Sequence, residues 1–185
     1  DIQGFITSGY GHLTAAAYLF VTIVEPAAGR GWIGSLLETI ATAAPWPRDE
    51  TGAPVKPATA VNVALTADGL RACALPSSVL CTFPIEFQEG IASPARSRIL
   101  GDTEESAPSA WELGGPTTEP VHAVVIVHAA DDRALDLAFA SEMSRLERTN
   151  GGVIPHAGAD QRGYRPSTDT EPFGFRDGIT QPSIV

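Results

Sequence analysis

The run Tyr18-Leu19-Phe20-Val21-Thr22-Ile23-Val24 is rich in β-branched and aromatic residues. Such residues favour strands, and nearly continuous apolarity is typical of a strand inside a sheet. Pro26 and the Gly29/Gly31 pair end this strand. Apolar residues then recur at helical spacing between Trp32 and Pro45, which predicts an amphipathic helix that covers one face of the sheet.

Three further strands and a second helix are predicted downstream. Residues 59–65 form a strand, and Thr66 caps a short helix or turn after it. Residues 121–129 form the next strand, a helix runs from Asp131-Asp132 to Asn150-Gly151-Gly152, and Val153-Ile154 starts the last strand. This order matches the split βαβ of a ferredoxin-like α+β sandwich with an antiparallel sheet.

A long insertion separates the second and third predicted strands. Across about residues 84–120 the apolar periodicity collapses, and prolines and acidic residues accumulate. This composition predicts an irregular, negatively charged excursion of the kind that is often functional in compact domains. We therefore expect residues 1–170 to form the ferredoxin-like domain and residues 171–185 to form a separate loop that leads into a missing second half.

Composition excludes some classes of partner. The formal net charge of -10 and the pI near 4.7 argue against nucleic acid and anionic membrane as partners. The longest apolar run, residues 15–24, is about half of a membrane span. Cys73 and Cys81 have no zinc or redox spacing and are expected to be free or packed thiols, with a bridge left open for a secreted protein. Localisation stays open.

The four histidines do not predict a metal site. His122 and His128 share a strand face, but six residues of strand place them about 20 Å apart. His12 and His156 lie in glycine-containing loops without a Cys or His at ligand spacing. We therefore expect structural roles for the strand histidines, partly buried and hydrogen-bonded.

The candidate chemistry lies near the end of the chain, in the string Glu171-Pro172-Phe173-Gly174-Phe175-Arg176-Asp177-Gly178-Ile179-Thr180-Gln181-Pro182. Its two glycines permit backbone angles closed to other residues and a close approach to a flat or bulky group. Asp177 would then project from a rigid turn. Aspartate-glycine is also an ordinary tight-turn pair, so a hairpin with a solvated carboxylate is the alternative.

The Phe173–Pro182 string resembles the signature loop of dye-decolourising peroxidases, haem enzymes of the ferredoxin-like α+β class. The similarity covers most of the chain, from Asp1 to Gln181. Its other parts are Asp1-Ile2-Gln3-Gly4, residues 61–66 with 69–72, and Phe83-Pro84-Ile85-Glu86-Phe87-Gln88-Glu89-Gly90 with Leu100-Gly101-Asp102.

The resemblance implies that two ferredoxin-like domains hold haem b and that the loop crosses the distal face of the porphyrin. Asp177 matches the family's distal acid-base residue. Hydrogen peroxide must lose a proton from one oxygen and gain one on the other before its O–O bond breaks, and a fixed carboxylate can carry that proton. The resemblance further implies that the haem-binding residues of this loop are Gly174, Phe175, Gly178, Ile179, Thr180 and Gln181.

The family's proximal histidine and distal arginine follow the signature loop, so we expect them from a complementary C-terminal chain or segment. No histidine of this chain is assigned as the iron ligand. The implied activity is reduction of hydrogen peroxide with oxidation of organic electron donors such as dyes and phenols, and the chain alone is expected to be inactive. The alternative is a non-catalytic ferredoxin-like binding or assembly module without haem. A haem-dependent lyase or dismutase on the same fold is a weaker third hypothesis.

Overall fold

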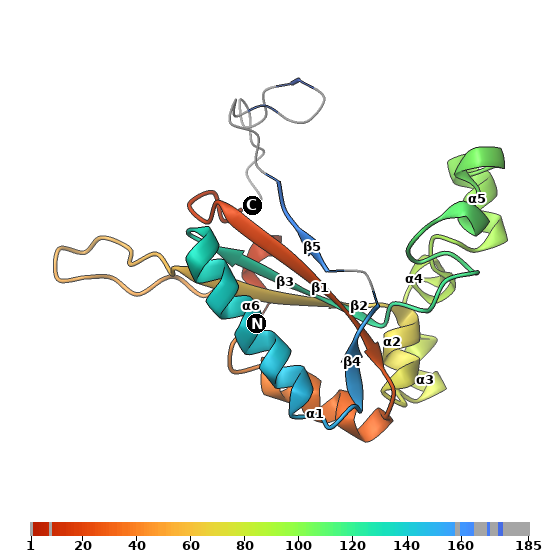
Figure 1. Ribbon diagram of the computed structural model, residues 1–185, viewed down its shortest axis with the longest axis horizontal. Coiled ribbons are helices and arrows are strands. Elements are labelled where there is room, and N and C mark those ends of the chain that lie inside the picture. The colour runs from red at the N-terminus through yellow and green to blue at the C-terminus, as the bar shows by residue number, and fades with distance from the viewer. Residues whose placement is uncertain (1, 8, 158–159, 165–169, 171–173, 176–185) are drawn as a thin grey trace.

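The centre of the molecule is one antiparallel sheet (Figure 1). The computed structural model describes residues 2–7, 9–157, 160–164, 170 and 174–175. Strands follow the order β2-β3-β1-β4, and β5 extends the sheet beside β1. The strands are β1 (Ala15–Ile23), β2 (Thr59–Leu65), β3 (Ala123–Ala129), β4 (Val153–Pro155) and β5 (Gln161–Arg162).

Two helices cover the same face of this sheet, as Figure 1 shows. α1 (Pro26–Leu36) connects β1 to β2, and α6 (Asp132–Glu147) connects β3 to β4. These are two interleaved split βαβ units, so the predicted ferredoxin-like α+β sandwich is confirmed. The remaining helices are η1 (Gly4–Ile6), α2 (Ala67–Ala72), α3 (Ser77–Leu80), α4 (Ile85–Glu89), α5 (Pro94–Leu100), η2 (Glu104–Ser106) and η3 (Pro108–Ala110).

The main core lies between the sheet and these two helices. The register sets Leu19 opposite Val125 and Val125 opposite Val63, so their side chains share one face. Along β1 and β3 every second residue is buried, and this set packs against the helices. Trp32 is buried there, as predicted from its place on the apolar side of its helix.

The first helix is displaced from its predicted position. α1 begins at Pro26 and ends at Leu36, whereas the sequence predicted a helix between Trp32 and Pro45. Proline fits the first turn because its missing N–H has no acceptor there. Gly29 lets the helix lie close to β1, since a Cβ at this position would stand 2.6 Å from Ile23 Cγ2.

Two predicted helix starts are confirmed in detail. Thr66 Oγ1 accepts a hydrogen bond from the Gly69 N–H at 3.0 Å, and Asp131 Oδ1 accepts one from the Ala134 N–H at 2.8 Å. At the far end of α6, Asn150 and Gly151 adopt positive φ angles, as expected of a helix terminus.

An ion pair within α6 faces the end of α1. Arg145 Nε donates to Glu142 Oε2 at 2.9 Å, and both side chains are nearly inaccessible to solvent. The same guanidinium donates to Ser35 O at 2.6 Å and to Thr39 Oγ1 at 3.2 Å. Arg145 therefore supplies a hydrogen-bond donor to a backbone carbonyl in the last turn of α1, while Glu142 of its own helix balances its charge.

The insertion is less irregular than the sequence predicted. Residues 84–120, here called the insertion lobe, contain α4, α5, η2 and η3 and stand away from the helix pair in Figure 1. Proline and serine at helix starts hide these short helices from a periodicity search. Much apolar surface of the lobe faces solvent: Ile85, Ile91, Ile99 and Leu100 are all more than half exposed.

The N-terminal segment lies along the outer edge of β2. Ile40 bridges to Val61, and Gln3 bridges to Thr42. The Gln3 side chain also pairs with the backbone of Val63, donating from Nε2 to its carbonyl at 2.7 Å and accepting from its N–H at 2.8 Å. Within the described ranges, no helix is long and apolar enough to cross a membrane.

Candidate functional site

Little of the predicted signature loop can be examined in the structure. Gly174 has a φ of 85°, in the left-handed region that favours glycine, and Phe175 is 75% exposed. These two residues therefore present a glycine turn and an aromatic ring that the described residues leave largely uncovered. Asp177, Gly178, Ile179, Thr180 and Gln181 lie outside the described residues, so their roles stay predictions.

The sheet face opposite α1 and α6, here called the open face, is also apolar. Side chains of β1 and β3 that alternate with the core residues point to it, and they are half-buried rather than buried. An apolar surface on both sides of a strand is typical of a sheet covered on both faces. The residues concerned are Ala16, Tyr18, Phe20 and Thr22 of β1 and Val124, Ile126 and His128 of β3.

The N-terminal segment covers one corner of the open face. Tyr10 is buried with Leu13 and Ala60, and its ring lies 5.4 Å from the His128 ring. Burial raises the pKa of Tyr10, an effect that neighbouring Asn62 partly offsets, and burial lowers the pKa of His128. Both rings are therefore held in their neutral forms near pH 7.

This corner contains polar atoms that the sequence did not identify. Asn62 Nδ2 donates to Gln3 Oε1 and to Ala41 O, both at 3.2 Å. Tyr10 Oη, Asn62 Oδ1 and His128 Nδ1 are buried and have no hydrogen-bond partner among the described residues. Such atoms are few in native folds and are usually satisfied by water or by a neighbouring chain. In the sequence, the only indication of this polar cluster is Asn62, a single asparagine within a run of valines and alanines.

The other histidines have structural partners, and none faces a shared metal site. His122 Nδ1 accepts from the Ile23 N–H at 2.9 Å, His12 Nε2 lies 3.1 Å from Pro57 O, and His156 Nε2 lies 3.1 Å from Glu119 O. Among the described residues, no group of three His, Cys, Asp or Glu side chains could hold a metal ion. The thiols of Cys73 and Cys81 are free, as expected.

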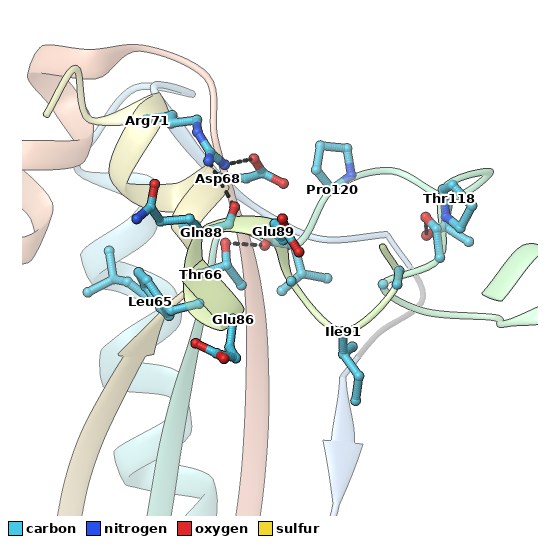
Figure 2. Close-up of a pocket in the computed structure, with 18 residues that line it drawn as sticks. Leu65, Thr66, Asp68, Arg71, Glu86, Gln88, Glu89, Ile91, Thr118 and Pro120 are labelled. Atoms are coloured by element: carbon cyan, nitrogen blue, oxygen red, sulfur yellow. Dashed lines mark hydrogen bonds and ion pairs between the residues drawn. The ribbon is translucent and has the colours of Figure 1, made fainter. Parts of the chain in front are cut away.

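A pocket of about 710 Å³ lies where the insertion lobe meets the end of β2 (Figure 2). α2 and α4 form one side, and residues 114–121 form the other. Thr66 Oγ1, which caps α2, also donates to Val121 O at 2.8 Å and joins the two sides. A Cβ at Gly69 would stand 1.9 Å from His122 O, so only glycine allows α2 to approach β3 this closely.

Opposite charges are paired around this pocket. Arg71 binds Asp68 at 2.7 Å and donates from Nη2 to Gln88 O at 2.9 Å. Arg96 binds Glu86 at 2.7 Å, and hydrogen bonding to its own backbone N–H, together with Arg96, lowers the pKa of Glu86. The sequence predicted Glu86 only as part of the negative charge of an irregular insertion. Its pairing with Arg96, 10 residues away, leaves no periodic pattern in the sequence.

Two curated relatives match the whole chain. A dye-decolorizing peroxidase of Exidia glandulosa is 26% identical over 186 residues, and dye-decolorizing peroxidase msp1 of Mycetinis scorodonius is 28% identical over 192 residues. Both alignments cover 100% of this chain but only 34% and 33% of the relatives. The chain thus spans about a third of their length. No family model matches it.

Solved structures agree on the fold. The DyP-type peroxidase AnaPX of Anabaena sp. superposes with a TM-score of 0.75 at 21% identity, covering 98% of this chain and 39% of that one. A fungal DyP-type peroxidase of Auricularia auricula-judae gives 0.69 at 24% identity, covering 98% and 37%. The resemblance to dye-decolourising peroxidases is confirmed, and the shares covered are consistent with an N-terminal half of such a protein.

Proposed function

We propose that this chain is the N-terminal part of a haem peroxidase that reduces hydrogen peroxide and oxidises organic donors such as dyes and phenols. The observation that carries the proposal is the similarity in sequence and in fold to dye-decolorizing peroxidases along the whole chain. The signature loop at residues 173–182 supports it, because this string is the most specific part of the resemblance.

We further propose that a complementary segment or chain packs against the open face. Tyr18, Phe20, Val124 and Ile126 present an apolar surface there, and about two thirds of the length of the relatives has no counterpart in this chain. Covering this surface would remove apolar area from water, at about 25 cal/mol per Å². The complementary segment would supply the proximal histidine and the distal arginine, since the described histidines serve the fold.

Residues 171–185 would form the haem-facing loop, and residues 1–170 would form the domain that supports it. Gly174 and Gly178 would allow the backbone to approach a flat ring, and Phe175 and Ile179 would provide apolar surface near it. Thr180 and Gln181 would continue this contact. The exposed ring of Phe175 and the left-handed Gly174 support this assignment. When bound, haem supplies the iron at which peroxide is reduced and to which organic donors give electrons.

Asp177 would be the catalytic acid-base residue. Its carboxylate would take a proton from one oxygen of hydrogen peroxide and return it to the other, so that water can leave. The carboxylate must be ionised before this transfer and is ionised again after it, which leaves the protein unchanged. The flanking glycines would allow the tight turn from which this carboxylate projects.

The test uses the haem-loaded protein, with the complementary segment present. Asp177→Asn should slow peroxide reduction about 100-fold or more while the haem absorption spectrum stays largely the same. Asp160→Asn, an identical change at an exposed residue outside the loop, should leave the rate within about twofold. Equal rates for the two variants would remove the proton-transfer role from Asp177.

The main alternative, a binding or assembly module without haem, makes a different prediction. A sample that stays colourless after haem is added, with the complementary segment present, would favour the module. A Soret band under the same conditions would favour the peroxidase. Dismutation and dehydration assays on that material would separate the peroxidase from the lyase or dismutase alternative.

A further inference from the structure

The pocket beside the insertion lobe has an apolar wall built from distant parts of the chain. Leu65 ends β2, Ile91 follows α4, and Val121 precedes β3, yet all three line one cavity. The volume of about 710 Å³ lies within the range of small-molecule sites. In Figure 2, Ile91 lies below Glu89 and Pro120, and Leu65 lies to the left of them. The wall therefore suits a ring-shaped apolar ligand.

One carboxylate in this pocket has no counter-ion. Asp68 is paired with Arg71, and Glu86 is paired with Arg96. Glu89 lines the same cavity, and its carboxylate makes no ion pair or hydrogen bond with any described residue. In Figure 2 its side chain stands between Thr66 and Pro120. The unpaired charge in the pocket is thus the negative charge of Glu89, and it lies next to the apolar residues.

We propose that this pocket binds a small organic cation that carries an aromatic ring. The ring would lie against Leu65, Ile91 and Val121, and the ammonium group would meet the carboxylate of Glu89. The net charge of -10 adds a field that favours cations over anions at any concave site. The proposal does not rest on the proposed peroxidase activity, because binding requires neither haem nor peroxide.

Three probes of the same shape test the charge preference. Tryptamine is a cation, tryptophol is neutral and indole-3-propionate is an anion. Titration of the 185-residue chain at low salt, followed by the methyl resonances of Ile91 and Val121, should give the order tryptamine, tryptophol, indole-3-propionate. Tryptamine should bind about fivefold more tightly than tryptophol, and added salt should reduce this advantage. Equal affinities for the three probes would overturn the proposal.

Two matched variants test the place of binding. Glu89→Gln should weaken tryptamine binding about fivefold, to the level of tryptophol. Glu147→Gln makes the same change of charge at the exposed end of α6 and should alter the affinity less than about twofold. Equal effects of the two variants, or methyl shifts confined to residues outside the pocket, would refute a site at Glu89. Both glutamates are exposed, so we expect both variants to fold normally.

Discussion

The two faces of the central sheet differ in what covers them, although both are apolar. On the helix-covered face, Leu19 and Val125 are buried almost completely. On the open face, neighbouring Phe20 and Val124 stay half-buried, and the N-terminal segment covers the corner at Tyr10. The strands alone therefore do not determine which face receives the helices. The composition of the sheet is typical of a sheet with both faces covered, whereas the described residues fully cover only the face beneath α1 and α6.

The largest effect is expected on the helix-covered side, where Arg145 joins α6 to the end of α1. Arg145→Met should lower the free energy of unfolding by about 3–5 kcal/mol, because it leaves the buried Glu142 carboxylate without its partner. Arg133→Met, on the exposed surface of the same helix, should cost no more than about 0.5 kcal/mol. Urea unfolding measures both variants. Similar losses for the two variants would show that the Arg145–Glu142 pair does not specifically stabilise the helix-covered face.

A direct comparison of the two faces uses adjacent residues of β1. Leu19→Ala should cost about 3 kcal/mol, since it leaves a cavity in the core. Phe20→Ala should cost about half as much in the same urea experiment, because water already reaches part of that ring.

Adding the complementary segment should change the cost of Phe20→Ala. The cost of Phe20→Ala should then approach that of Leu19→Ala, since the open face would become a second core. Equal costs in the chain alone would mean that the open face is already covered without a partner.

The smallest effect concerns His128 on the open face. Burial lowers its pKa in the folded chain below the ordinary value of 6.5, so the unfolded chain takes up the proton first as pH falls. The buried neutral imidazole therefore costs no stability above pH 6.5. As pH falls from 6.5 towards the pKa of His128 in the folded chain, the free energy of unfolding decreases. His128→Gln should remove this part of the acid sensitivity, as measured by urea midpoints of both proteins across that range.

A covered open face should make this sensitivity larger, because further burial lowers the pKa of His128 again. If parent and His128→Gln lose stability in parallel, the imidazole is not held neutral by burial. The other titrating groups that face it offer no such effect within the described residues, since Tyr10 remains neutral throughout this range.

Much of the fold followed from the sequence, because it depends on local patterns. The strand at residues 59–65 was predicted with its observed bounds, and the cap at Thr66 and the helix start at Asp131-Asp132 were predicted from residue type. Helix α1 was misplaced because Pro26 and Gly29 read as breakers, whereas the first serves as a helix start and the second as a contact with β1. β5 was missed, since two polar residues carry no strand pattern.

The candidate sites were less predictable, for a physical reason. The signature loop was found through its resemblance, and most of its residues lie outside the described structure. The pocket at Glu89 depends on residues from β2, α4 and the approach to β3, and only tertiary structure brings these together. The buried ion pair of Arg145 and Glu142 was not predicted from the sequence. Leu137 recurs with the apolar residues of the same helix and was expected among them, but it is 67% exposed.

The side chain of Gln3 has a consequence for how this sheet can associate. Exposed strand edges are templates on which a strand of another molecule can add, and this is a route to aggregation. Here the Gln3 amide occupies the backbone groups of Val63, residues 40–42 shield the same edge, and β4 and β5 line the opposite one. Strand addition is therefore hindered at the β2 edge, and at the opposite edge the short strands β4 and β5 offer little length for pairing. Recognition by another polypeptide is left to side chains on the open face, where sequence can distinguish one partner from another.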